Sequence, residues 1–158
     1  MKNIKHIFFD LDNTLWDYRR NAEIAVRKVY REFGIEKEYG YGFDEFYGHY
    51  YEVNESLWEK YRNAEITRPE LQSRRFPESF KSLGIQNPDF AVEFELRFMA
   101  EVSDGKHLVP NAIEILEYLK GKYHIHIITN GFPKTTDYKI NNSILKDFVE
   151  TIVTAESA

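Results

Sequence analysis

The sequence predicts an α/β protein in which a parallel β-sheet is flanked by helices and interrupted by an inserted helical domain. Strand-like segments alternate with helical ones, and a long helical block separates the first strand from the second. The strand-like segments lie at 4–10, 123–128 and 150–154, and helical periodicity covers 111–121 and about 134–147. Strand–helix–strand alternation at this spacing is typical of a parallel sheet with helices on its faces.

The first strand-like segment runs from Ile4 to Asp10 and is short, apolar and rich in strand-forming residues. This composition predicts a buried strand that ends at Asp10. The second strand-like segment is stopped by Thr129-Asn130-Gly131, which is a turn sequence. Both strands therefore run directly into polar residues at their carboxyl ends.

The stretch between the first and second strands has helical periodicity throughout. Helices are expected at 19–33, 43–62, 67–84 and 89–102. Thr67 and Glu70 have the spacing of a capping box, which marks the start of the third of these helices. The pattern predicts a helical domain at 17–104, inserted into an α/β core made of 1–16 and 105–158.

The composition excludes several classes of protein. Hydrophobic residues make up 42% and charged residues 30%, which is typical of a soluble globular protein, and the length of 158 residues favours one domain or one domain with an insertion. A formal net charge of −5 argues against a polymer of nucleic acid as partner but allows a phosphorylated small molecule. No apolar run approaches the roughly 18–20 residues that span a bilayer, so no membrane association is expected. The absence of cysteine excludes a disulfide framework and fits a cytoplasmic location. The sequence indicates no oligomeric state.

The strongest functional signal is the pair of carboxylates Asp10 and Asp12, which follow the first strand. An isolated pair of this kind is often a turn that leads Asn13 and Thr14 out of a strand. In open α/β sheets, however, ligands bind outside the carboxyl ends of the strands. There, one carboxylate can attack phosphorus and the other can transfer protons. The pair also suits Mg²⁺, which prefers oxygen ligands and shares them with phosphate.

A second signal closes the second strand, where Thr129 is followed by Asn130 and Gly131. A hydroxyl followed by glycine at the entry to a helix offers a side-chain donor and exposed backbone N–H groups to a phosphate. Alone, these residues form an ordinary turn. Beside the paired carboxylates they predict a phosphate site.

At these two points the sequence resembles the haloacid dehalogenase superfamily. The resemblance implies a Rossmann-like core, here incomplete, with an α-helical cap that closes over the phosphate site and selects substrates. It implies that Asp10 is the nucleophile, that Asp12 is the general acid/base and that Thr129 is the second-motif hydroxyl. It also implies a Mg²⁺ ion held by the side chain of Asp10 and the backbone carbonyl of Asp12.

Within that superfamily the sequence is most similar to the pyrimidine nucleotidases, which hydrolyse pyrimidine nucleoside monophosphates. The resembling segments are Asp12–Asp17, Leu57-Trp58, Glu65–Thr67, Arg75-Phe76 and Thr129–Phe132, the last continuing to Lys139 and Ser143. Thr136 departs from this group, which has glutamine there. A sugar-phosphate phosphatase or a phosphoglucomutase of the same superfamily is the alternative.

Two further family motifs are expected after the third strand: a lysine, and then an acidic segment after a fourth strand. Lys134, Lys139 and Lys146 all precede the third strand, so none matches the lysine motif, and Lys139 is interpreted as a residue of the helix after the second motif. The missing fourth strand would lie beside the first, which otherwise forms an unpaired edge. A longer gene product is therefore expected, and the chain alone is expected to have little activity. An inactive phosphate-binding fragment is the second alternative.

Two pairs of residues near these motifs have less specific patterns. His124 and His126 share one face of the second strand, but with no third ligand candidate nearby they are interpreted as ordinary sheet positions. Trp16 and Tyr18 follow the carboxylate loop, where contact with substrate and packing at the cap hinge are equally consistent with the sequence.

Overall fold

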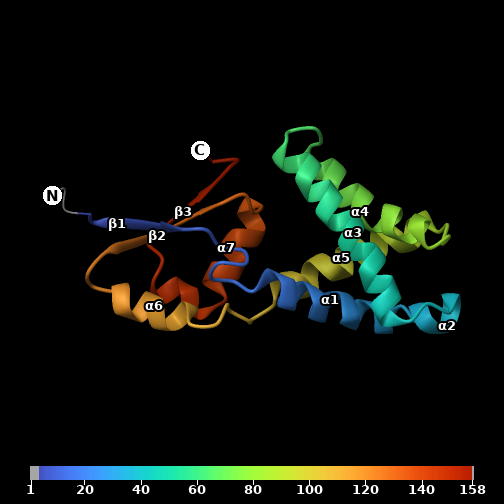
Figure 1. Cartoon of the computed structure of the whole chain (residues 1–158), viewed down its shortest axis with the longest axis horizontal. Coiled ribbons are helices and arrows are strands. Elements are labelled where there is room, and N and C mark those ends of the chain that lie inside the picture. The colour runs from blue at the N-terminus through green and yellow to red at the C-terminus, as the bar shows by residue number, and fades with distance from the viewer. Residues whose placement is uncertain (1–3, 158) are drawn as a thin grey trace. The chain divides into compact units, whose positions relative to one another are not determined.

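Three parallel strands lie side by side in the first of two units into which the computed structural model divides (Figure 1). The structure describes residues 4–157. The first unit combines Met1–Ala22 with Ser103–Ala158, and the second is Glu23–Val102. The strands are β1 (His6–Phe9), β2 (His124–Thr129) and β3 (Thr151–Thr154).

The sheet has the order β1-β2-β3 within the described residues, and both neighbouring pairs are parallel. In the first pair, His6 lies opposite His124 and Phe9 lies opposite Ile127. The parallel α/β fold expected from the alternation of strands and helices is thus confirmed. Each strand begins or ends within one or two residues of its predicted position.

The helices of this unit pack on one face of the sheet. They are α6 (Ala112–Leu119), α7 (Pro133–Asn141) and the short 3-10 helix η1 (Ile144–Asp147). The buried cluster joins them to the strands and to the loop after β1, and its members are Leu11, Leu15, Trp16, Ala112, Leu116, Leu119, Ile125, Ile127, Ile140 and Leu145. The helical stretch expected at about 134–147 is divided into α7 and η1, because Ser143 has extended backbone angles and its hydroxyl accepts from Leu145 N to cap η1.

The opposite face of the sheet carries Phe8, His126 and Ile128. Phe8 is 54% exposed and Ile128 is 53% exposed. The prediction of a buried first strand is therefore wrong, because His6 and Phe8 are exposed and Ile7 and Phe9 are only partly buried. Within residues 4–157, β1 pairs with a neighbour on one side only, and the packed helices cover the face that holds Ile125 and Ile127.

The second unit is built from helices joined by short connections. Its helices are the rest of α1 (Tyr18–Glu32), with α2 (Ile35–Tyr39), α3 (Phe43–Arg62), α4 (Arg68–Ser82) and α5 (Pro88–Ser103). The capping box expected at Thr67 is present, since its hydroxyl accepts from Glu70 N and its N–H donates to the Glu70 carboxylate. The short helix α2 was not predicted, because five residues between two glycines are too few to show a helical period. Among the described residues, no helix combines the length and apolarity needed to cross a membrane.

Aromatic rings fill the interior of this unit. The fully buried rings are Phe46, Tyr50, Phe76, Phe80, Phe94 and Phe98. Arg75 is buried among them, stacks over the Phe98 ring at 4.8 Å and pairs with the Glu95 carboxylate. A charge this deep is tolerated because its hydrogen bonds to a carboxylate offset the loss of hydration.

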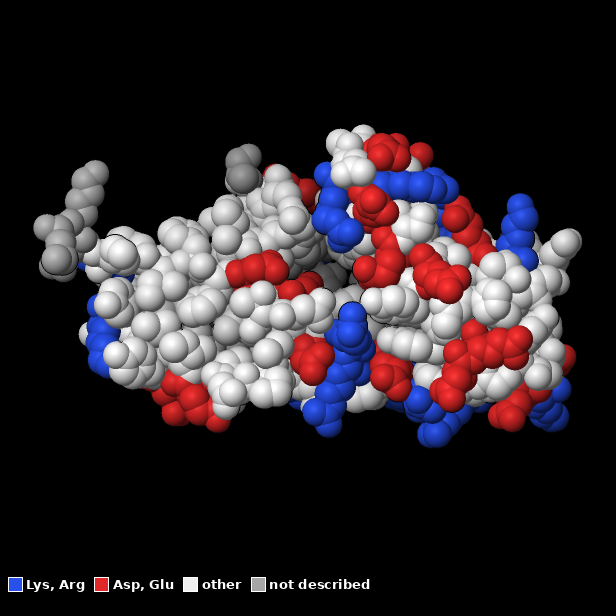
Figure 2. All heavy atoms as spheres, in the orientation of Figure 1, with Lys and Arg blue, Asp and Glu red and all other residues white. Residues whose placement is uncertain are grey.

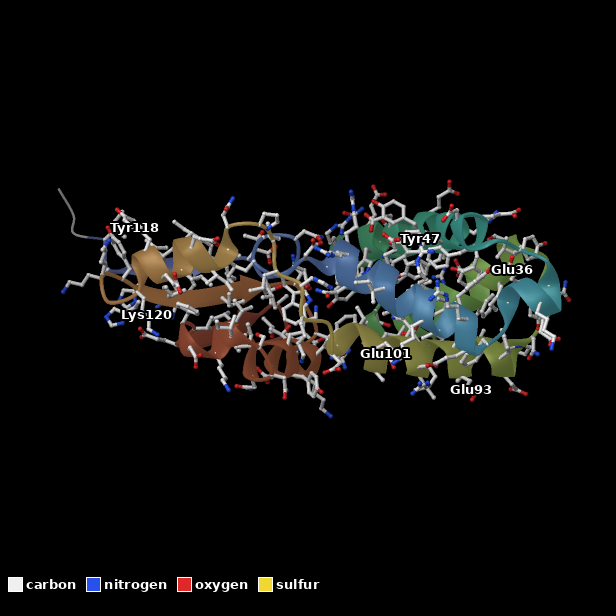
Figure 3. All side chains as sticks on the ribbon, turned by 90° about the horizontal axis from the view of Figure 1, so that it is seen from below. Glu36, Tyr47, Glu93, Glu101, Tyr118 and Lys120 are labelled. Atoms are coloured by element: carbon white, nitrogen blue, oxygen red, sulfur yellow. The ribbon has the colours of Figure 1, made fainter. Side chains whose placement is uncertain are left out.

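Charged side chains of both signs cover the outer surface of the helices, as the face drawn in Figure 2 shows. On α5, Glu93 and Glu101 are labelled in Figure 3, and Arg97 pairs with Glu32 at 2.9 Å. Lys28 pairs with Glu101 at 2.7 Å. Ion pairs of this exposed kind contribute little each to stability.

The boundary between the units falls inside α1 rather than before it. The Asn21 amide donates to His107 O at 2.9 Å and accepts from His107 N at 3.1 Å, and Asp17 N also donates to His107 O. A Cβ on Gly105 would lie 2.6 Å from the Asn21 side chain, so this approach requires glycine. The first turn of α1 is therefore held by the α/β unit, whereas the sequence placed the boundary after residue 16. Whether 17–104 acts as a cap remains a proposal.

Candidate active site

The predicted site residues lie where β1 and β2 end. The two strands are parallel neighbours, so their carboxyl ends meet at one edge of the sheet. Asp10 and Asp12 flank Leu11, which is fully buried and anchors the chain in the core. Asp10 is exposed, and its carboxylate has no hydrogen-bonding partner among residues 4–157. An exposed, unpaired carboxylate at this position is what an attacking group requires.

The loop that carries Asp12 is held by hydrogen bonds to a single backbone carbonyl. Leu11 O accepts from Thr14 N, Leu15 N and Trp16 N at 3.2, 2.9 and 2.9 Å. Asn13 takes a left-handed backbone (φ 60°), which asparagine tolerates better than most residues. Its side chain then accepts from Arg19 N at 3.1 Å and so joins the loop to the start of α1. Asp12 is thus held on a defined turn.

The two sequence motifs meet at Gly131. Its N–H donates to the Thr129 hydroxyl at 3.1 Å, and Thr129 is buried at the end of β2. A Cβ built on Gly131 would lie 3.4 Å from Thr129 Oγ1 and 3.6 Å from Asp12 Oδ2. The structure therefore brings together Asp12, Thr129 and Gly131, as the sequence predicted. Asn130 is exposed, and its side chain has no partner among the described residues.

The structure adds Lys139, which the sequence interpretation set aside as an ordinary residue of the helix. Its Nζ lies 2.7 Å from Asp12 Oδ1, and the side chain is 4% exposed. The same nitrogen lies 5.7 Å from the centre of the Trp16 ring and 5.2 Å from that of Tyr18. A cation therefore does lie at Asp12, although no lysine follows β3 in the described residues.

A signal for Lys139 was present in the helical pattern of α7. Thr136, Lys139 and Ile140 are three and four residues apart, and all three are buried. They form the inward face of the helix. Thr136 faces the same site, because a Cβ on Gly131 would lie 2.8 Å from its hydroxyl. A lysine at an inward position of an amphipathic helix indicates a buried partner of opposite charge.

The donors at this site fit part of a magnesium shell. Among the described residues, no group of three or more His, Cys, Asp or Glu could hold a metal ion. Asp10 supplies a free carboxylate, while one carboxylate oxygen of Asp12 already binds Lys139, which favours the Asp12 carbonyl as the metal ligand. Mg²⁺ is commonly bound by one or two carboxylates, with water and phosphate oxygens as the other ligands.

The histidines on the outer face of the sheet lie close together. His6 lies beside both histidines of β2: its Nδ1 is 2.9 Å from His126 Nε2, and its ring stacks on that of His124 at 4.8 Å. Among the described residues, however, no group of three or more potential ligands is arranged to hold a metal ion. His124 is paired with Glu150 at 2.9 Å.

Trp16 is almost fully buried in the core cluster, so its ring packs there.

Comparison with known proteins identifies a family. The model of the haloacid dehalogenase-like hydrolases matches residues 4–157. The chain is 24% identical to the HAD-hydrolase YfnB of Bacillus subtilis over 156 residues, 99% of this chain and 63% of YfnB. It is 28% identical over 150 residues to pyrimidine 5′-nucleotidase YjjG of Escherichia coli, covering 95% of this chain and 62% of YjjG. Pyrimidine 5′-nucleotidase PynA of Streptococcus pneumoniae is 24% identical over 153 residues, 96% of this chain and 62% of PynA.

Solved structures share the fold. A magnesium-bound crystal structure of YfnB from Bacillus subtilis superposes with a TM-score of 0.86 at 22% identity, covering 98% of this chain and 66% of that one. A Thermotoga maritima protein named as a β-phosphoglucomutase gives 0.62 at 18% identity, with 98% and 63% covered. The chain thus spans less than two thirds of the length of these relatives.

Proposed function

The chain belongs to the haloacid dehalogenase-like hydrolases, and we propose that it carries the nucleophile and the acid/base of a magnesium-dependent phosphatase. The observation that supports this proposal is the arrangement of the two carboxylates after the end of β1. The exposed Asp10 carboxylate has no partner among residues 4–157, while two residues later Asp12 is held by Lys139 and lies near Gly131. One carboxylate is therefore available for attack and the other is held in place.

In the proposed reaction, Asp10 attacks the phosphorus of a phosphate monoester. A bond forms between the Asp10 carboxylate and phosphorus, and the bond from phosphorus to the ester oxygen breaks. Asp12, which enters this step as the protonated acid, gives its proton to the leaving oxygen, which departs as an alcohol. Water then attacks the aspartyl-phosphate, Asp12 takes its proton, and phosphate is released with Asp10 restored. Thr129 would donate its hydroxyl hydrogen to a phosphoryl oxygen, since its oxygen already accepts from Gly131 N.

Mg²⁺ would be held by the side chain of Asp10 and the backbone carbonyl of Asp12, and it would supply positive charge that lowers repulsion between nucleophile and substrate. The chain's own contribution is to hold the Asp12 carboxylate with Lys139, on the turn around Leu11 O. This placement lets Asp12 act with little reorganisation in the transition state.

We propose pyrimidine nucleoside monophosphates as the substrate class. Support comes from the likeness to two pyrimidine 5′-nucleotidases over nearly all of this chain, at 28% and 24% identity. The likeness in fold to a protein named as a phosphoglucomutase keeps a sugar phosphate as the second candidate. The helical segment 17–104 would act as the cap that distinguishes them. The protein's partner is then a phosphorylated small molecule, not a nucleic-acid polymer. The absence of cysteine supports a cytoplasmic location.

The test is phosphate release from a panel of nucleoside monophosphates and sugar phosphates, with Mg²⁺ present. Asp10→Asn keeps the shape of the nucleophile and removes its charge, so turnover is expected to fall to background. Asp17→Asn is the matched control, because Asp17 accepts from Arg20 N on the same segment without belonging to the site. Near-normal turnover in Asp10→Asn would show that Asp10 is not the nucleophile. Preference for a sugar phosphate would replace the nucleotide with the second candidate.

A further inference from the structure

Lys139 has more hydrogen-bonding capacity than the protein uses. An ammonium group has three N–H donors. One is used for Asp12 Oδ1, and residues 4–157 offer no other hydrogen-bond acceptor to this nitrogen. The side chain is nevertheless buried, with only 4% of its surface exposed. Buried donors are normally satisfied, so a buried ammonium with spare donors indicates a binding partner of negative charge.

The buried ammonium of Lys139 lies next to the point where the two strand-end motifs meet. It contacts Asp12 through Oδ1, and the other oxygen of that carboxylate, Oδ2, would lie 3.6 Å from a Cβ on Gly131. The Thr129 hydroxyl would lie 3.4 Å from the same Cβ. Asp12 therefore lies next to both the ammonium and the turn that holds the hydroxyl, and a phosphoryl oxygen can accept hydrogen bonds from both kinds of donor.

We propose that Lys139 is the phosphate-binding cation of this site, in addition to positioning Asp12. This inference rests on the proposed phosphatase function. Without substrate, Lys139 holds the Asp12 carboxylate in place. With substrate, its spare donors bind a phosphoryl oxygen, so that one buried cation offsets both the acid/base and the incoming anion. A lysine on the helix after β2 then supplies positive charge that the family pattern places after the third strand.

Binding of inorganic phosphate to residues 1–158 tests the assignment without requiring turnover. The chain has two tryptophans, so Trp58→Phe leaves Trp16 as the single reporter, 5.7 Å from Lys139 Nζ. In this background, phosphate with Mg²⁺ should give a saturable change in Trp16 fluorescence. Lys139→Met keeps the length of the side chain and removes the charge, and it should weaken phosphate binding by about tenfold or more. Lys139→Arg should stay within a few-fold of the parent.

The matched control is Lys134→Met, which removes an exposed lysine from the same helix and should leave phosphate binding unchanged. A structural role alone would lower the melting temperature of Lys139→Met but leave its phosphate affinity intact. If that variant does not fold, Asp12→Asn is the second measurement. It releases Lys139 from its carboxylate and should tighten phosphate binding.

The outcomes separate this inference from the proposed function. Phosphate affinity within threefold of the parent in a folded Lys139→Met variant would overturn the role of Lys139 and leave the phosphatase proposal standing. Weaker or unchanged phosphate binding in Asp12→Asn would overturn it as well. No saturable phosphate response in the parent chain would instead overturn the phosphate site, and the proposed function with it.

Discussion

Replacing Gly131 by alanine should destabilise the protein. An alanine there would place its Cβ 2.8 Å from Thr136 Oγ1, closer than carbon and oxygen normally approach. Thr136 is 2% exposed and lies on a packed helix, so its hydroxyl has little room to move. Overpacking of this kind costs about 1–3 kcal/mol. For a chain of this size, that corresponds to a fall in melting temperature of roughly 2–12 °C. Since the same Cβ would lie 3.6 Å from Asp12 Oδ2, phosphate binding should weaken too.

The assay is thermal and urea unfolding of Gly131→Ala, followed by circular dichroism, with Thr136→Ala and the double variant. Removing the Thr136 hydroxyl should recover most of the loss, with a coupling energy of about 1 kcal/mol or more. Gly48→Ala is the control and should change stability in the opposite direction, because Gly48 is exposed inside α3 and a Cβ there meets nothing within 4 Å. It should stabilise the protein by about 0.5–1 kcal/mol. A Gly131→Ala variant as stable as its parent would refute the close packing of Gly131 against Thr136.

Two further predictions concern the helical unit. Thr67→Ala removes the hydroxyl of the capping box and should destabilise the protein by about 1 kcal/mol in urea unfolding at neutral pH. Hydrogen bonds from Thr67 hold the pKa of Glu70 below its usual value. Stability from this contact is therefore present above the unfolded-state pKa and lost as the pH falls, so the difference between parent and variant should shrink in acid. Arg75→Met should cost about 3–5 kcal/mol, because it leaves the Glu95 carboxylate largely buried without its partner; Arg97→Met, at an exposed pair, should cost far less.

Local patterns predicted most of the backbone but not the contacts between distant side chains. Helices such as α3 and α4 could be found because their periodicity and their capping residues are encoded within a few neighbouring positions. The end of α7 was missed because Ser143 stops it through a local hydrogen bond that competes with the helix. The exposure of Phe8 was missed because an apolar strand is buried only where something covers it.

The candidate site was also predicted only in part, from local patterns but not from contacts between distant residues. Asp10, Asp12 and Thr129 could be placed because the carboxyl ends of parallel strands meet at one edge of a sheet. The pairing of Lys139 with Asp12 joins residues 127 positions apart, and no period in the sequence encodes it. What the sequence does contain is a lysine on the inward face of α7, a conflict between pattern and residue type of the sort found at functional sites.

This pairing changes the expected activity of residues 1–158. With no lysine after the third strand, the sequence predicts that two electrostatic contributions are missing. Each is worth roughly 3–4 kcal/mol, or a factor of about a hundred to a thousand in rate. If Lys139 supplies one of these two contributions, only the one from the complete magnesium shell is still missing. The loss in rate should then be closer to a single factor of about a hundred to a thousand.

The measurement compares phosphate release by residues 1–158 with release by the longer gene product that the sequence predicts. Asp10→Asn of the same short chain defines zero activity. Residues 1–158 should be slower by about a hundred- to a thousandfold, yet remain above that zero, and Lys139→Met should remove what is left, although such losses do not add exactly as free energies. Equal rates for the two lengths would mean that the described residues already form a complete site. A rate no higher than that of Asp10→Asn would mean that Lys139 does not replace the missing charge, because the buried cation would then serve Asp12 alone.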